Sequence, residues 1–257
     1  MNITIHDQKD FDMMLEAGKL AKHILNTLDD FIKIGISTED INQFCHNEII
    51  KHKAIPAPLN YHGFPKSVCT SINDVICHGI PNVNEILKDG DIINVDVTVI
   101  LNGYYGDTSR MYSVGSAKKD IKKQKLINTT YECMMLGIDV AKPGEKLLDI
   151  GRVIQNHAEK NGFSVVRDFC GHGIGTKFHT EPNVLHYYPG DKYESYYDLT
   201  LQNGMFFTIE PMINEGKWNS IIDKNDKWTA RTVDGKLSAQ FEHTIGITNN
   251  GNIIFTN

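Results

Sequence analysis

An Asn-Gly pair at positions 102–103 separates two extended runs in the stretch DIINVDVTVILNGYYGDTSRMY, residues 91–112. Such a pair between extended runs is typical of a type I′ turn, in which both turn residues adopt positive φ. A two-residue turn also fixes the pairing of the strands, because residues whose numbers sum to 205 must then face each other. The sequence therefore predicts an antiparallel hairpin with a defined register.

The predicted hairpin brings two carboxylates together on one face. Side chains alternate along a strand, so the opposite face is apolar and comprises Ile93, Val95, Val97, Val99 and Leu101. The register places Asp96 opposite Ser109, and it places Asp107 opposite Thr98. The two aspartates become diagonal neighbours with Cβ atoms somewhat under roughly 7–8 Å apart. Such carboxylates repel unless a cation or proton lies between them, so they are either solvent-exposed or ligands of a divalent metal ion.

Two glutamates occur in similarly apolar extended stretches. Glu210 lies between Ile209 and Pro211 in GMFFTIEPMIN, and Glu242 lies in SAQFEHTIGIT. A glutamate is costly to bury unless it is paired or bound to a metal, although either one alone is an ordinary surface residue of a strand. Together with the two aspartates they predict an oxygen-rich site for two metal ions.

Two histidines, His172 and His179, lie seven positions apart in the glycine-rich stretch FCGHGIGTKFHTEP. They are a metal-binding pair, an acid/base couple or two unrelated side chains, and this stretch alone does not decide between them. Its GHGIG segment also resembles a dinucleotide-binding loop, but the third glycine of that motif is replaced by Thr176 and no helix start follows.

A Cys-His pair occurs in VICHGIPN, residues 75–82. A cysteine nucleophile activated by histidine is one interpretation of Cys77 and His78. Neighbours on an extended chain point to opposite faces, however, so this interpretation is disfavoured.

Helical periodicity and capping signals predict four helices, near residues 11–28, 37–51, 120–141 and 145–161. The second begins at a capping box formed by Ser37 and Asp40. Extended runs at 68–77, 91–101, 104–114, 163–168, 205–213 and 239–247 predict strands. The mixture indicates an α+β fold with a largely antiparallel sheet, formed by residues 1–257 as one domain.

The composition excludes several classes of protein. A net charge of −6 argues against nucleic acid as a partner, and the basic run at 118–126 reads as the start of a helix. No run reaches the roughly 18 apolar residues of a membrane span. The five cysteines form no CxxC pair and the first residues resemble no signal peptide, which predicts a cytoplasmic protein.

Five blocks, in this order, resemble the type I methionine aminopeptidases in their short bacterial form. They are YHGFPKSVCTSINDVICHGIP, INVDVTVILNGYYGDTSRMY, GHGIGTKFHTEP, GMFFTIEPMI and SAQFEHTIGIT. The resemblance implies the pita-bread fold of creatinases and aminopeptidases, a curved antiparallel sheet flanked by helices with pseudo-two-fold symmetry. It also implies a monomer and a dinuclear site for Co, Fe, Mn or Zn, with ligands Asp96, Asp107, His172, Glu210 and Glu242.

The resemblance further implies roles around this metal site. Glu210 would transfer protons, while His78 and His179 would contact the substrate. A methionine pocket would be formed by Tyr61, Phe64, Cys69, Phe178 and Trp228, with His62 at its entrance. Phe64 stands where the family often has tyrosine, and the longer connection at 187–201 has no assigned role.

The implied activity is removal of the N-terminal methionine from nascent proteins at the ribosome, with preference for a small second residue. A water activated by two metals would attack the scissile carbonyl. Two alternatives remain: an Xaa-Pro aminopeptidase or dipeptidase of the same fold, and a metal-free binding protein of that fold.

Overall fold

The computed structural model describes residues 3–197 and 199–257. Its α-helices are α1 (Gln8–Thr27), α2 (Thr38–Lys51), α3 (Ile121–Val140), α4 (Leu147–Lys160) and α5 (Asp191–Tyr197). The first four confirm the predicted helices. The fifth lies in the connection at 187–201, of which residue 198 is outside the described residues.

Helix α2 begins as its sequence predicts. The Ser37 side chain accepts a hydrogen bond from the Asp40 backbone N–H at 3.1 Å, and the Asp40 carboxylate accepts one from the Ser37 N–H at 2.8 Å. These two bonds satisfy donors that would otherwise have no partner at the helix start. Among the described helices, none combines the length and apolar character that crossing a bilayer requires.

In the described residues, the strand pairs of the main sheet are all antiparallel. The strands follow the order β1-β4-β5-β14-β9-β7-β8, and in addition β2 pairs with β4 and β15 pairs with β14. Its strands are β1 (Ile55–Pro56), β2 (Cys69–Ile72), β4 (Ile92–Leu101), β5 (Tyr104–Ser113), β7 (Gly171–Gly173), β8 (Thr180–Val184), β9 (Phe206–Ile209), β14 (Glu242–Thr248) and β15 (Gly251–Ile254).

Two smaller sheets adjoin it. One has the order β13 (Ser238–Gln240), β10 (Met212–Asn214), β6 (Ser164–Val165). The other has the order β11 (Ser220–Ile222), β12 (Ala230–Thr232), β3 (Val75–Cys77).

The hairpin β4–β5 has the predicted register. Leu101 pairs with Tyr104, Asp96 with Ser109 and Thr98 with Asp107. Asn102 and Gly103 both have positive φ, 52° and 85°. The sequence rule therefore placed both aspartates on the correct face.

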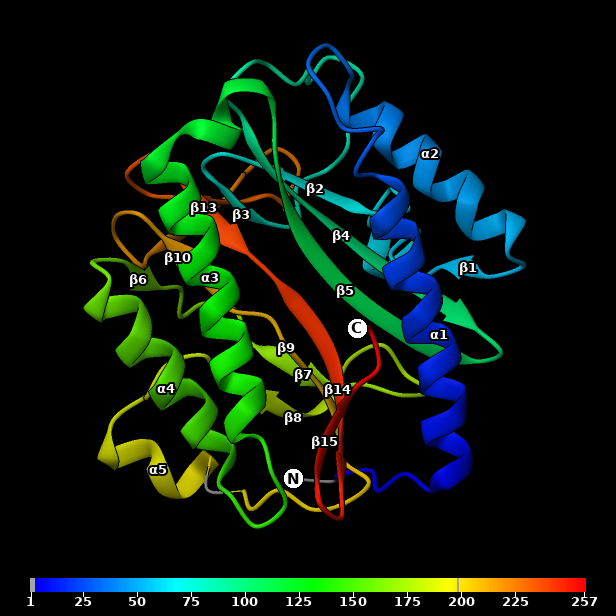
Figure 1. The fold of residues 1–257 in the computed structure, drawn as a ribbon, viewed down its shortest axis with the longest axis vertical. Helices are drawn as coiled ribbons and strands as arrows, with labels where there is room; N and C mark the ends of the chain where they lie inside the picture. Colours follow the sequence, from blue (N-terminus) through cyan, green and yellow to red (C-terminus); the bar gives the residue numbers. More distant parts are fainter. Residues whose placement is uncertain (1–2, 198) are drawn as a thin grey trace.

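Helices cover the sheet in two pairs (Figure 1): α1 and α2 lie over the half that contains β4, and α3 and α4 lie over the half that contains β9 and β14. The predicted apolar face of β4 packs against the first pair, and Val95, Val97 and Val99 are fully buried there. The α+β prediction is confirmed, and the opposite face of the sheet is left for polar side chains.

Three predicted strands are each divided in the structure, and the first of them, the run 68–77, forms β2 and β3. The run 205–213 forms β9 and β10, which are separated by Glu210 and Pro211, and the run 239–247 forms β13 and β14, separated by Phe241. Proline has no N–H to donate to a strand neighbour, so the ladder ends beside it. Strand β7 was not predicted, because three residues of Gly-His-Gly show no alternating apolar pattern. The short strands β1, β8, β11, β12 and β15 also lie outside the predicted runs.

Candidate metal and substrate site

Five consecutive strands of the main sheet each bring one side chain to a common cavity. Asp96 lies on β4, Asp107 on β5, Glu242 at the start of β14, Glu210 directly after β9, and His172 on β7. All five line a cavity of about 560 Å³. The structure therefore brings together the complete set of metal ligands proposed from the sequence.

Donor atoms of three of these side chains lie close enough to share a cation. One ligand atom from each of Asp107, His172 and Glu242 lies within 4.8 Å of the others. His172 Nε2 is 3.6 Å from Asp107 Oδ2 and 3.5 Å from Glu210 Oε1. Asp96 Oδ1 is buried without a hydrogen-bond partner in the described part of the chain. A buried carboxylate oxygen without a partner fits a metal ligand.

His172 is oriented to offer Nε2. Its Nδ1 lies 3.2 Å from the Gly173 carbonyl oxygen, which can only accept, so Nδ1 carries the hydrogen. Nε2 is then the free lone pair that faces the carboxylates. This backbone contact corresponds to the outer hydrogen bond that metal-binding histidines usually make.

The electrostatics of the site also fit a cation. Burial raises the pKa of Asp96 to about 7 and that of Glu210 to about 8. Burial, reinforced by neighbouring carboxylates, raises the pKa values of Asp107 and Glu242 well above their ordinary range. Burial lowers the pKa of His172 to about 3, which keeps the ring neutral. Four clustered carboxyls can therefore all ionise at neutral pH only if positive charge lies among them.

Glu210 is held by side chains that the sequence analysis did not identify. The Thr208 hydroxyl donates to Glu210 Oε1 at 2.8 Å and accepts from the His172 N–H at 3.0 Å. Gln240 Nε2 donates to Glu210 Oε2 at 3.3 Å, and the Glu210 N–H donates to His186 Nε2 at 3.1 Å. Thr208 could have been found, because it precedes Glu210 by two residues on the same strand face. His186 had no such signal.

Asp107 has a partner that the hairpin register does predict. The Thr98 hydroxyl donates to Asp107 Oδ1 at 2.7 Å, across the pair of residues that face each other on β4 and β5. The other oxygen of the carboxylate, Asp107 Oδ2, is the one nearest the imidazole of His172.

The glycines around His172 allow strands to approach closely. A Cβ atom on Gly171 would lie 2.4 Å from the Thr208 carbonyl oxygen, and one on Gly173 would lie 2.1 Å from the Glu181 carbonyl oxygen. Both separations are too short for any side chain. The GHGIG segment therefore serves strand packing, and the resemblance to a dinucleotide-binding loop is wrong.

Aromatic side chains form one wall of the same cavity. All five residues proposed for the methionine pocket line it: Tyr61, Phe64, Cys69, Phe178 and Trp228. The Phe64 and Trp228 rings meet edge to face at 5.3 Å, and the Tyr61 and Phe178 rings are 4.8 Å apart. His62 is exposed beside Tyr61 and does not line the cavity.

The two histidines proposed to contact substrate also line the cavity. His179 Nδ1 shares a 2.8 Å hydrogen bond with the Tyr61 hydroxyl, and its ring lies 4.1 Å from that of His172. His78 packs against Phe169, with ring centroids 5.4 Å apart. Burial lowers the pKa of His179 to about 4 and also lowers the pKa of His78, so both rings are neutral.

The argument from strand alternation at Cys77 and His78 fails. His78 has a positive φ of 56°, so the chain is not extended there, and both side chains line the cavity. The interpretation as a nucleophile still finds no support, because burial raises the pKa of the Cys77 thiol well above its ordinary value. A reactive cysteine needs a lowered pKa.

Comparison with known proteins agrees with this geometry. A model of metallopeptidase family M24 matches residues 12–249. The chain belongs to this family.

An M24 relative named methionine aminopeptidase, from Rickettsia prowazekii (strain Madrid E), is 57% identical over 256 residues, which are 100% of this chain and 96% of the relative. The crystal structure of methionine aminopeptidase from Rickettsia prowazekii has a TM-score of 0.95 at 56% identity and covers 100% of both chains. These likenesses confirm the expected pita-bread fold and the resemblance seen in the sequence.

A prolidase from Pyrococcus horikoshii OT3 is similar in fold alone. Its TM-score is 0.74 at 19% identity, covering 98% of this chain and 63% of the prolidase. The fold is therefore shared with enzymes whose names indicate different substrates, and the choice of substrate depends on the cavity.

Proposed function

We propose that this chain is a metal-dependent methionine aminopeptidase, which removes the N-terminal methionine from nascent polypeptides with a small second residue. The observation that carries this proposal is that one cavity combines a wall suited to metal ions with a wall suited to an apolar side chain. One wall presents four carboxylates and a neutral imidazole, and the other is lined by aromatic rings and a thiol. The high identity to relatives named methionine aminopeptidase supports the same activity.

The metal-binding wall fits two divalent ions, held by Asp96, Asp107, His172, Glu210 and Glu242. Carboxylates with a single imidazole suit Mn, Fe, Co or Zn. Such ions supply an activated water as nucleophile and Lewis-acid stabilisation of the carbonyl oxygen.

Glu210 is the side chain that moves the proton. It accepts a proton from the attacking water and passes it to the leaving amine. Thr208 and Gln240 each donate a hydrogen bond to its carboxylate, at 2.8 and 3.3 Å, and so fix its orientation. Burial raises the pKa of this carboxyl to about 8, and a positive charge beside it would favour the ionised form.

The two neutral histidines bind the reacting peptide. When the Tyr61 hydroxyl donates to His179 Nδ1, the His179 Nε2–H is free to donate to the oxygen that develops negative charge. His78 is placed to hydrogen-bond the amide of the scissile bond.

The aromatic wall receives the methionine side chain. Phe64 is 3% exposed and Cys69 is 7% exposed, so the pocket is closely packed. Thioethers interact favourably with aromatic ring edges, which suits the rings of Phe64, Phe178 and Trp228. His62, which is exposed beside Tyr61 and outside the cavity lining, would lie at the entrance of the pocket.

We further propose that residues 1–257 form one domain, which acts as a monomer in the cytoplasm on chains emerging from the ribosome. The net charge of −6 favours a peptide substrate over direct recognition of nucleic acid.

Cleavage of a Met-Ala-Ser peptide, with Ala-Pro as control, tests the proposal. Purified protein should release methionine when loaded with Mn, Fe, Co or Zn, and chelation should abolish the release. Cleavage of Ala-Pro in preference to Met-Ala-Ser would favour an Xaa-Pro peptidase. A folded protein that binds no metal and cleaves neither peptide would favour a binding protein of the same fold.

A further inference from the structure

The segment 57–68, which links β1 to β2, carries much of the aromatic wall. It contains Tyr61 and Phe64 and leads directly into Cys69. Its backbone is irregular, since Asn60 and His62 both have positive φ, 68° and 47°. A segment with this conformation needs contacts from outside to hold its shape.

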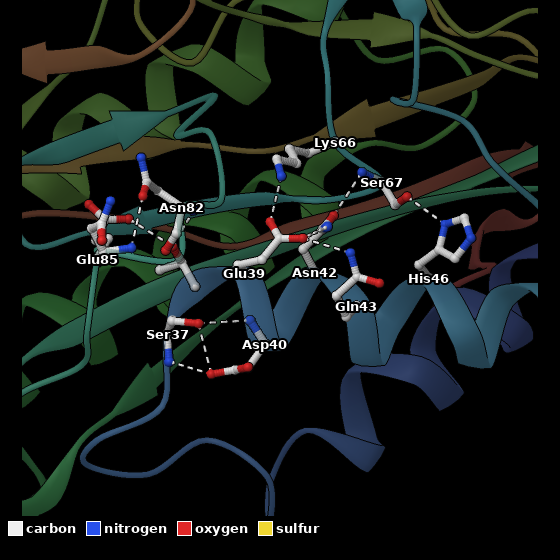
Figure 2. A network of polar contacts seen from close by, with 12 residues as sticks. Ser37, Glu39, Asp40, Asn42, Gln43, His46, Lys66, Ser67, Asn82 and Glu85 are labelled. Carbon is white, nitrogen blue, oxygen red and sulfur yellow. Dashed lines mark hydrogen bonds and ion pairs between the residues drawn. The ribbon is translucent and has the colours of Figure 1, made fainter.

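Helix α2 supplies these contacts (Figure 2). Asn42 Oδ1 accepts the Ser67 backbone N–H at 2.9 Å, and His46 Nδ1 shares a 2.8 Å hydrogen bond with the Ser67 hydroxyl. Glu39 Oε2 accepts from Lys66 Nζ at 2.6 Å. Positions 39, 42 and 46 are spaced by three and four residues, so they share one face of the helix.

Glu39 also determines which way the Asn42 amide points. Its Oε1 accepts the Asn42 NH₂ at 3.1 Å and the Gln43 NH₂ at 2.6 Å. A carboxylate only accepts, so the Asn42 NH₂ must face Glu39 and the Asn42 oxygen must face Ser67. Asn42 and Ser67 are 4% and 3% exposed, so water cannot replace this bond.

The charge of Glu39 is stable in this arrangement. Burial by itself would raise the pKa of Glu39, but hydrogen bonds from Gln43, Lys66 and Asn42 outweigh it and lower the pKa. Glu39 therefore remains an acceptor throughout the neutral range.

Ser67 lies close in sequence to the residues that shape the pocket. Phe64 precedes it by three residues and packs edge to face on Trp228 at 5.3 Å. Cys69 follows it by two residues and pairs with Asp96 in β2–β4. A shift of Ser67 would therefore move Phe64 and Cys69 in the aromatic wall, whereas the proposed metal ligands on β5, β7 and β14 and directly after β9 lie on other strands.

We propose that Asn42, oriented by Glu39, is a positioning residue that sets the shape of the methionine pocket through Ser67. The inference rests on the proposed function, since it concerns how tightly and how selectively the N-terminal side chain is bound. It assigns a role in substrate specificity to a helix face that touches neither metal nor substrate.

The test replaces Asn42 with leucine, which has nearly the same shape and no acceptor. In the metal-loaded enzyme, Asn42→Leu should raise KM for Met-Ala-Ser about five- to tenfold, the loss expected for one buried hydrogen bond, and kcat should stay within about twofold. Preference for Met-Ala-Ser over Leu-Ala-Ser should fall by a similar factor, because a loosened pocket discriminates less between side chains.

Three further variants complete the design. Glu39→Ala, at a less buried position, should shift KM in the same direction by about two- to threefold. The double variant Glu39→Gln with Asn42→Asp exchanges donor and acceptor between the two positions, and it should restore KM to within about threefold of wild type. Lys51→Ala removes an exposed ion pair with Glu48, 3.2 Å long, on the same helix and outside this network, and it should leave KM unchanged.

Calorimetric binding of free L-methionine, with L-leucine as comparison, measures the pocket without turnover. If the unmodified protein binds methionine but does not cleave Met-Ala-Ser, the proposed activity fails while the inference is still tested by the change in affinity. A lower thermal stability of Asn42→Leu, or a lower kcat, with unchanged KM, methionine affinity and selectivity would overturn the inference. Failure of the double variant to recover would also overturn it.

Discussion

Because the pKa of Glu210 is raised, the metal-free protein should lose stability as pH rises. The substitution Glu210→Gln should remove this dependence. The folded-state pKa is about 8 against an ordinary value of 4.5. The proton held by the native carboxyl contributes stability below about pH 4.5, and this contribution is lost as pH rises through about 8. In Glu210→Gln, a neutral amide of the same shape takes the place of the protonated carboxyl and does not titrate.

The size of the effect follows from the pKa. Each pH unit over which only the native state holds the proton changes the free energy of unfolding by about 1.4 kcal/mol. Between about pH 6 and pH 8 the Gln variant should therefore gain about 2 kcal/mol relative to wild type, because the native carboxyl is already half ionised at the upper end of this range. For a chain of this size, that corresponds to roughly 4–8 °C in the difference between their Tm values.

The assay is thermal unfolding by circular dichroism, after chelation and dialysis, at several pH values across this range. His179 titrates in both proteins and cancels in the difference, because burial and neighbouring histidines, not Glu210, lower its pKa. With metal restored, the order should reverse, because an amide is the weaker ligand. A Tm difference that stays constant or shrinks as pH rises would refute the account of a buried, neutral Glu210.

Three activity predictions concern the same cavity. Metal-loaded Glu210→Gln should have a kcat for Met-Ala-Ser at least about a hundredfold lower than wild type, and its circular dichroism spectrum should be normal. Near-normal turnover would contradict the proton-transfer role of Glu210. His172→Ala should bind less metal by elemental analysis, whereas His179→Ala should keep its metal and turn over more slowly; equal metal loss in both would contradict the division of roles. Thr208→Val removes hydrogen bonds to Glu210 and from the His172 N–H and should lower kcat about tenfold, while Thr208→Ser keeps both and should stay near wild type.

The part of the site that the sequence predicted well is the part governed by local rules. A two-residue turn specifies the register of β4 and β5, so the positions of Asp96 and Asp107 followed from counting. The helices followed from apolar spacing and capping residues. These features depend on neighbours in the chain, which a single sequence displays.

The parts that were missed depend on contacts between distant segments. His186 supports Glu210 from 24 positions away, and no periodicity identifies it. The short strand with His172 exists because Gly171 and Gly173 let it approach β9 and β8, a condition that only the folded sheet reveals. Strand alternation also predicted wrongly that the side chains of Cys77 and His78 point to opposite faces. The positive φ at His78 turns the chain there, and no apolar pattern in the sequence indicates it.

The tight turn at Asn102 and Gly103 has a consequence for how this chain can vary in length. Surface turns are usually where chains accept insertions. Here one added residue, if the turn itself kept two residues, would shift the register by one and move Asp107 to the face that packs against α1. A carboxylate would then enter the apolar interior, and the cavity would lose a ligand. The length of this exposed turn therefore bears directly on the direction in which a residue of the cavity points, although the turn lies far from the cavity along both strands.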